Sequence, residues 1–247
     1  MTLRCVSRGI VALSLVTVST AALSATMIRF KDDSEGVSSE IWVSGPKARV
    51  NQPEDGGYMI MDLKANRQYM VSDQEKRVID MTDMAKGMKG MIGDAVPHEQ
   101  PPLDLKVEKK GKGPEIVGFA TERYIVSVGD EVCFEEFLSP QALRTGDIKH
   151  FTDAMAVMND GLADVGAEPC DRAEAEMAKR YGSLGVPLRS LDAEGSVIHE
   201  VTTLNVNFDP PPGAFDFPAG YQRTTLQEVM QEMMRNGPPG MTMPPND

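Results

Sequence analysis

Residues 58–81 read YMIMDLKANRQYMVSDQEKRVIDM, and this stretch decides the fold. Apolar and polar residues alternate within it in short runs, with the two-residue period of half-buried β-strands and not the 3.6-residue period of helices. The runs are separated by residues typical of turns, at Ala65-Asn66 and Asp73-Gln74. The stretch therefore predicts three antiparallel strands joined by tight turns.

The strand pattern continues on both sides of this stretch. Upstream, residues 37–43 alternate around Trp42, the only tryptophan, and residues 26–80 as a whole predict a meander of hairpins. Downstream, strand patterns return at residues 103–107, 116–128, 131–138, 186–191 and 197–208. These segments predict a mainly β fold of the α+β class, with a large antiparallel sheet.

Helical periodicity interrupts the strands and predicts two to four helices. Ser139-Pro140 combines a capping residue with a first-turn proline and begins a helical insertion over residues 140–182. Ile148, Phe151, Met155 and Met158 keep helical spacing within the insertion. A second helix fits residues 169–181 and should end at Gly182, and a closing helix fits residues 224–235.

The first 25 residues are typical of a cleavable signal peptide. Arg4 and Arg8 precede an apolar stretch that ends in the small residues Leu23-Ser24-Ala25. Cys5 lies before that stretch, so it is not placed to accept a lipid. We predict export to the periplasm, a β-rich domain over residues 26–235 and a disordered tail over residues 236–247.

Charge excludes some classes of partner. The chain has 25 basic and 37 acidic residues, a net charge of −12, and removing Arg4 and Arg8 with the signal leaves −14. Nucleic acids and anionic membrane surfaces are therefore not expected as partners, because both require a positive face. The basic cluster Lys106, Lys109, Lys110 and Lys112 is predicted to lie at a solvated hairpin tip.

Two cysteines remain after removal of the signal, Cys133 and Cys170. In an oxidising compartment, an even pair most simply forms one disulfide. No Cys-x-x-Cys spacing suggests a redox or metal pair. The predicted bridge ties the helical insertion to the sheet and contributes roughly 3 to 4 kcal/mol.

Three sets of residues carry a resemblance to a known family. They are the hairpins of residues 58–81, the strand pair from Gly118-Phe119 to Tyr124, and the closing Phe-x-Phe-Pro-x-Gly-Tyr at residues 215–221. In these the chain resembles the DUF4412 family of exported bacterial proteins and, more distantly, periplasmic lipoprotein carriers of the LolA and LolB type. The resemblance implies an unclosed antiparallel β-barrel, a half-barrel wrapped around helices, with an apolar concave face.

The closing motif has its own physical interpretation. Phe215 and Phe217 should share one face of an extended segment, Pro218 should end the strand pairing, and Gly220 should adopt a left-handed turn before Tyr221. We expect these residues to fasten the last element to the core.

The sequence has no recognisable catalytic motif and no histidine in a metal-ligand spacing. His98, His150 and His199 are far apart, and none belongs to a metal-ligand spacing. Glu135 and Glu136 are neighbours on a predicted strand and should face opposite sides. We therefore expect a monomeric protein that is not an enzyme and carries no cofactor.

Methionine is the most unusual residue, with 17 in the chain. One hypothesis is an apolar groove for a lipid, an acyl chain or another hydrophobic ligand, because thioether side chains are flexible and polarisable. Its predicted lining residues are Met59 and Met61 from the sheet and Met81, Met84, Met88 and Met91 from one helix face.

Three other interpretations stay open. The methionines could simply pack a core that is poor in aromatic residues. The Met-x-x-Met spacings could bind Cu(I), which soft thioethers favour, with Met241 and Met243 as a second such site. The acidic domain could also be a protein-interaction module of the cell envelope.

Overall fold

The predicted hairpins of residues 58–81 form the strands β4, β5 and β6 of one large sheet. The computed structural model describes residues 24–32, 37–52, 57–84, 102–159 and 168–236. The predicted signal segment, the tail, Met88 and Met91 lie outside these ranges, apart from residues 24, 25 and 236. No helix in the described ranges is long and apolar enough to span a membrane.

The strands and helices have the following bounds. The strands are β1 (Ala25–Asp32), β2 (Val37–Ser44), β3 (Lys47–Gln52), β4 (Gly57–Asp62), β5 (Arg67–Ser72), β6 (Arg77–Asp80), β7 (Leu105–Lys112), β8 (Glu122–Val128), β9 (Glu131–Ser139), β10 (Val186–Asp192), β11 (Val197–Phe208) and β12 (Gln222–Thr225). The helices are α2 (Pro140–Leu143), α3 (Ile148–Asn159), α4 (Pro169–Ala178), α5 (Tyr181–Leu184) and α6 (Leu226–Asn236).

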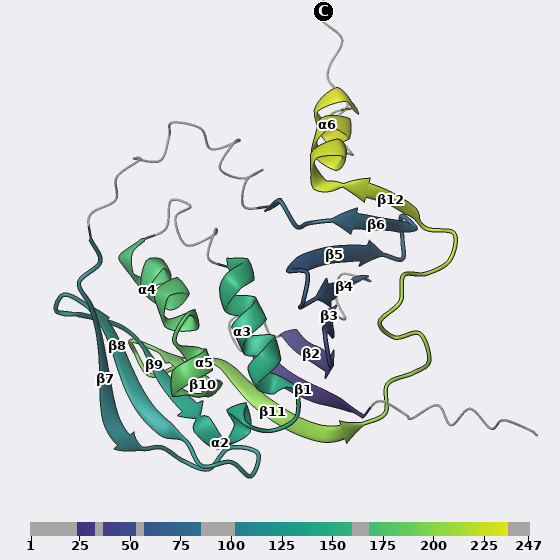
Figure 1. The fold of residues 1–247 in the computed structure, drawn as a ribbon. Coiled ribbons are helices and arrows are strands. Elements are labelled where there is room, and N and C mark those ends of the chain that lie inside the picture. The colour runs from purple at the N-terminus through teal and green to yellow at the C-terminus, as the bar shows by residue number, and fades with distance from the viewer. Residues whose placement is uncertain (1–23, 33–36, 53–56, 85–101, 160–167, 237–247) are drawn as a thin grey trace, which may run out of the picture.

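All twelve described strands belong to one unclosed sheet, in the order β12-β6-β5-β4-β3-β2-β1-β11-β10-β9-β8-β7. Every neighbouring pair is antiparallel except β12 and β6, which are parallel. Figure 1 shows the sheet curving around α3, α4 and α5, which lie on one of its faces. The predicted fold class, a mainly β chain with an unclosed antiparallel sheet, is confirmed. Five helices are described because the insertion includes two single-turn helices, α2 and α5.

Two strands were not predicted. In β3, the buried Ala48 and Val50 alternate with polar residues, but the segment has just two apolar residues, too few to stand out as a strand on its own. β12 has no apolar residue at all, and its pairing begins where the amide of Gln222 donates to the carbonyl of Lys76. Such a strand is defined by its distant partner and not by its own sequence.

Two core clusters join the helices to the sheet. The first packs α3 against β2, β3 and β4 through Ala154, Val43 and Met61. The second packs α4 against β8 and β9 and includes Met177 and Leu138. The predicted disulfide between Cys133 and Cys170 is present and links β9 to α4.

The helical insertion begins as predicted but is divided differently. The Ser139 hydroxyl accepts a hydrogen bond from the amide of Ala142 and caps α2. The single helix predicted over residues 169–181 is two helices, α4 and α5, and Gly182 lies inside α5. Gly185 ends α5 with φ of 140°, and a Cβ there would lie 2.7 Å from the carbonyl carbon of Ser139. Only glycine fits this crossing of two backbones.

The basic cluster lies on β7, the edge strand, and not at a hairpin tip. The chain turns later, where Ile116 and Phe119 form an isolated bridge. Lys109 pairs with Glu122 on β8 at 2.6 Å, and Lys106 lies 3.5 Å from Asp130. Charged side chains along an exposed edge oppose pairing with another sheet.

The closing segment fastens the C-terminal part to the sheet, as expected. Phe217 packs edge to face against Tyr69, with ring centroids 4.9 Å apart, and the Tyr221 hydroxyl donates to Asp73 at 2.8 Å. Gly220 has the expected left-handed conformation, with φ of 81°. Phe215, however, lies in a run of turns after Pro211, so the prediction that it shares an extended segment with Phe217 is wrong.

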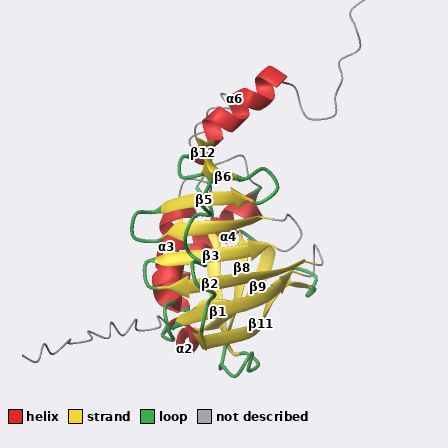
Figure 2. Ribbon diagram, turned by 90° about the vertical axis from the view of Figure 1, so that its right-hand side faces the viewer, coloured by secondary structure: helices red, strands yellow, loops and turns green. Residues whose placement is uncertain are grey.

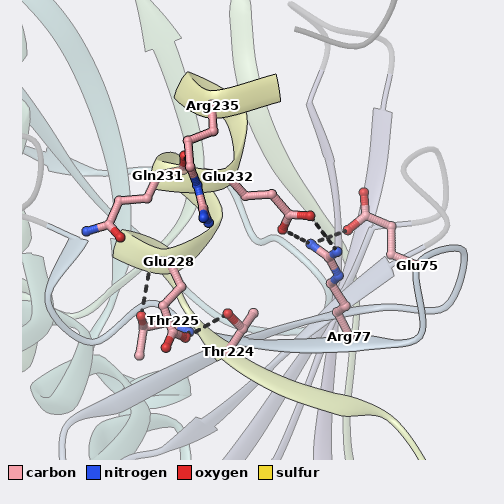
Figure 3. A network of polar contacts seen from close by, with 8 residues as sticks. All are labelled: Glu75, Arg77, Thr224, Thr225, Glu228, Gln231, Glu232 and Arg235. Atoms are coloured by element: carbon pink, nitrogen blue, oxygen red, sulfur yellow. Dashed lines mark hydrogen bonds and ion pairs between the residues drawn. The ribbon is translucent and has the colours of Figure 1, made fainter. Parts of the chain in front are cut away.

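Polar contacts set the position of α6 (Figure 3). The Thr225 hydroxyl accepts from the amide of Glu228, and the Glu228 carboxylate accepts from the amide of Thr225, which forms a reciprocal cap. Arg77 of β6 forms a two-pronged ion pair with Glu232, with a nitrogen to oxygen distance of 3.0 Å for its shorter contact. Helix α6 extends away from the sheet beyond β12 (Figure 2).

Candidate functional site

An apolar cavity of about 380 Å³ lies between the sheet and the helices α3, α4 and α5. The sheet contributes side chains from β1, β2, β10 and β11. Its apolar walls include Ile28, Phe30, Ile41, Ile198, Val201 and Leu204 from the strands, and Phe151, Met155, Ala156 and Ala178 from the helices.

Strand register assembles the apolar wall. Ile28 on β1 is paired with Ile41 on β2 and with Leu204 on β11. Cross-strand partners point to the same face of a sheet, so these three side chains form one apolar row. Phe30 and Val201 form the next pair along β1 and β11 on the same face.

A polar row crosses five strands farther along the same face. Register pairs Asp32 with His199, His199 with Ser190, Ser190 with Glu136, and Glu136 with Tyr124. Asp32 and His199 line the cavity, together with Glu174 and Tyr181 from the helices. One end of the cavity is therefore polar while the rest is apolar.

Glu136 is the most deeply buried acid of this row, with 3% of its surface exposed. The Tyr181 hydroxyl donates to its Oε1 at 2.9 Å. Ser190 lies opposite Glu136 on β10, and the Ser190 and Tyr181 hydroxyls both act to lower the pKa of this carboxyl. Burial, with a smaller contribution from the charge of Glu174, raises the pKa of Glu136 to about 7.

Burial also shifts the pKa values of two other titratable groups at this end. Burial lowers the pKa of His199, although the nearby Asp32 carboxylate opposes the change, so the imidazole is neutral at pH 7. Desolvation raises the pKa of Glu174, and the charge of Asp171 adds to this effect. Asp32 and Glu174 are the two charged side chains lining the described cavity, and neither lysine nor arginine belongs to its lining.

The four described methionines of the predicted groove do not line this cavity. Met61 is 1% exposed and packs in the core under α3, with Met59 partly buried in the same cluster. Met81 and Met84 are partly buried, and neither lines the cavity. Met88 and Met91 lie outside the described residues. The methionine-lined groove and the Cu(I) site therefore both stay predictions.

The cavity itself could not be located from the sequence. The helical spacing of Phe151 and Met155 is visible in the sequence, but the surface that these side chains face is not. His199 belongs to no metal-ligand spacing, so no sequence pattern marks it. The missing information is the pairing of β1 with β11, because no local pattern specifies which distant strand is the partner.

Other predictions about acids and metals can be compared with the geometry. Glu135 pairs with Arg123, with a nitrogen to oxygen distance of 2.6 Å, and lies partly exposed while its neighbour Glu136 is buried. The two carboxylates therefore face opposite sides, as predicted. Within the described ranges, no group of three histidine, cysteine or acidic side chains is arranged to hold a metal ion.

Comparisons with known proteins give structural neighbours only. No protein-family model and no curated protein matches the chain, so the DUF4412 resemblance stays a prediction. Crystal structures of MucB, one of them a MucA/MucB complex from Pseudomonas aeruginosa, are similar over 81% of this chain at 14% identity, with TM-scores of 0.37 and 0.38. The chain spans 60% and 58% of the length of these two MucB chains. At these scores the likeness defines no shared function.

Proposed function

We propose that this chain is an exported, non-enzymatic protein that binds a small hydrophobic molecule, such as a lipid or an acyl chain, between its sheet and the helices α3 to α5. The observation that carries the proposal is the apolar cavity of about 380 Å³. Ligand sites typically measure about 300 to 1,000 Å³ and combine apolar walls with a few polar groups. This cavity has that combination, since the apolar row of Ile41, Ile28 and Leu204 leads towards Asp32 and His199.

The size of the cavity limits the ligand and its affinity. Burying one methylene gains about 0.8 kcal/mol, so a chain of about ten carbons gains roughly 8 kcal/mol. This gain corresponds to a dissociation constant of about 1 µM as the tightest expected value, before the cost of immobilising the ligand. A single chain fits this proposal better than a two-chain lipid.

A pair of neighbouring residues on α3 allows a matched test. Ala156 lines the cavity, whereas Val157 is 59% exposed on the same helix. Titration with the neutral dye N-phenyl-1-naphthylamine should show fluorescence enhancement with the native chain and with Val157→Phe. Ala156→Phe fills the cavity and should abolish the enhancement. Dye binding that is absent from the native chain, or equal in both variants, would contradict the proposal.

A second candidate function is binding to another protein of the cell envelope, and α6 favours it. Met233 and Met234 on this helix are 52% and 79% exposed, whereas Leu226, Val229 and Met230 on the same face are partly buried. An apolar helix face of this kind suits a partner that presents a matching apolar stripe.

Position-specific crosslinking tests this second function. A photoreactive residue at Met234 should trap one defined protein in cells that express the chain. The same residue at Arg235, which is exposed on the opposite face of α6, should not. Purified partner should then bind the native chain and lose binding to Met233→Glu. Equal crosslinking at both positions would reject this function.

A further inference from the structure

His199 lines the cavity with an imidazole whose nitrogens form no hydrogen bond to any described residue. The ring packs edge to face against Phe30 instead, with centroids 6.5 Å apart. Other polar side chains of the lining are already used: the Thr152 hydroxyl donates to a carbonyl of its own helix, and the Tyr181 hydroxyl donates to Glu136. A partly buried donor or acceptor without a partner costs free energy, and a ligand that bonds to it recovers that cost.

The two acids of the lining do not form one joint site for a cation. Asp32 is the register partner of His199 on β1 and already has another interaction. Glu174 interacts electrostatically with Glu136 and Tyr181. Glu136 lies two strands from His199 in the sheet, which is roughly 10 Å. No lysine or arginine belongs to the described lining, so an anionic head group would find no opposite charge there.

Apolar side chains lead away from His199 along two neighbouring strands. On β11, Val201 follows on the same face, and Leu204 lies roughly 17 Å from His199. On β1, Phe30 is paired with Val201, and Ile28 with Leu204. A hydrocarbon chain that lies along this row therefore places its polar end beside the imidazole.

We infer that His199 selects the ligand of the cavity, a single-chain lipid whose head is an uncharged hydroxyl group bonded to the imidazole, in preference to a fatty acid. This inference rests on the proposed binding of a hydrophobic molecule. A neutral imidazole has one donor and one acceptor, and a hydroxyl group also donates and accepts, so the two can bond whichever nitrogen carries the proton. A carboxylate only accepts, and it would bring a charge into a partly desolvated site without a cation.

The surroundings of His199 keep its imidazole uncharged. Burial lowers the pKa of the ring and outweighs the charge of Asp32, which acts to raise it. A neutral ring offers a lone pair to a hydroxyl group. An imidazolium has two donors and no acceptor, and it would suit a carboxylate instead.

Three ligands with the same ten-carbon chain test the head group. Decanol, decanoate and decylamine, each below its solubility and micellar limits, would compete with bound N-phenyl-1-naphthylamine at pH 7. We expect decanol to bind most tightly, about tenfold more tightly than decanoate. Decanoate or decylamine that matches or exceeds decanol overturns the inference and leaves the proposed function standing, as does bound dye that decanol fails to displace. Absence of dye binding by the native chain overturns the proposed function itself.

Substitutions of His199 separate the hydrogen bond from the shape of the cavity. His199→Leu should weaken decanol about fivefold, the effect of one hydrogen bond, whereas the affinity for the dye, which has no hydroxyl, should change less than about twofold. His199→Gln should restore most of the affinity for decanol, because an amide also donates and accepts. His150→Leu is the control, since His150 is exposed on α3 and does not line the cavity. Equal losses of decanol and dye in His199→Leu, or no loss of decanol, would remove His199 from the head-group contact.

Discussion

The hydroxyl of Tyr181 donates a hydrogen bond to Oε1 of Glu136 and joins the single-turn helix α5 to strand β9. This contact lies at the polar end of the cavity, because Tyr181 lines the cavity and Glu136 lies behind it. It therefore links the stability of the helical insertion to the electrostatics of the candidate site.

Replacing Tyr181 by phenylalanine should destabilise the fold. The substitution leaves Oε1 of the buried Glu136 without its donor, at a cost of about 1 to 3 kcal/mol in the free energy of unfolding. Urea denaturation measures the difference. Tyr221→Phe is the control, because its hydroxyl bonds to Asp73 at an exposed position and should contribute less. Equal losses in the free energy of unfolding of the two variants would show that the buried contact stabilises the fold no more than the exposed one.

Glu136 should make the protein less stable as the pH rises from about 4.5 to 7. Its pKa is about 7 in the folded state and near 4.5 when unfolded, so the unfolded chain releases this proton first. The loss in the free energy of unfolding is about 3 kcal/mol over that range. Glu136→Gln should flatten the dependence, measured by urea denaturation at pH 5 and pH 7.5, whereas Glu135→Gln should keep it. If the free energy of unfolding of Glu136→Gln depended on pH as strongly as that of the native chain, Glu136 would not be the cause of the dependence.

The disulfide between Cys133 and Cys170 should contribute about 3 to 4 kcal/mol, because it closes a sequence separation of 37 residues. Thermal unfolding should shift to lower temperature when reductant is added to the native chain. The variant with both cysteines replaced by serine should already unfold at that lower temperature and should not respond to reductant. A native chain indifferent to reductant would contradict this prediction.

Gly185→Ala should destabilise the fold by about 2 kcal/mol or more. The residue has φ of 140°, and the added Cβ would contact the backbone of Ser139 and Pro140. Gly195→Ala is the matched comparison, since Gly195 also has positive φ, at 88°, but has open space around it. It should cost about 1 kcal/mol. Chemical denaturation should therefore show a larger loss in the free energy of unfolding for Gly185→Ala than for Gly195→Ala.

Local pattern explains which parts of the fold were predictable. The alternation in residues 58–81 is imposed by one buried face, so β4 to β6 were visible in the sequence. The capping role of Ser139 was predictable because a cap acts on the helical turn that follows it. The disulfide was predictable because two cysteines remain after the signal. β12 was not visible, because its four polar residues become a strand only beside β6.

The candidate site was less predictable for the same reason. Met61 and Ile28 are both apolar residues on strands, and nothing in their own segments shows that one packs in the core while the other lines a cavity. That difference depends on the pairing of β1 with β11 and on where α3 crosses the sheet. An apolar ligand site stays a hypothesis from the sequence, and the strand register decides where the cavity lies.

The pairing of β1 with β11 has a consequence for the order of folding. The meander from β2 to β6 and the hairpins from β7 to β11 each consist of neighbours in sequence and can form early. β1 can meet β11 only after some 170 residues of intervening chain have been made, and contacts of such separation form slowly. The cavity, whose walls include side chains from both strands, is thus completed near the end of folding, and a ligand present during refolding should bind only in the slow phase.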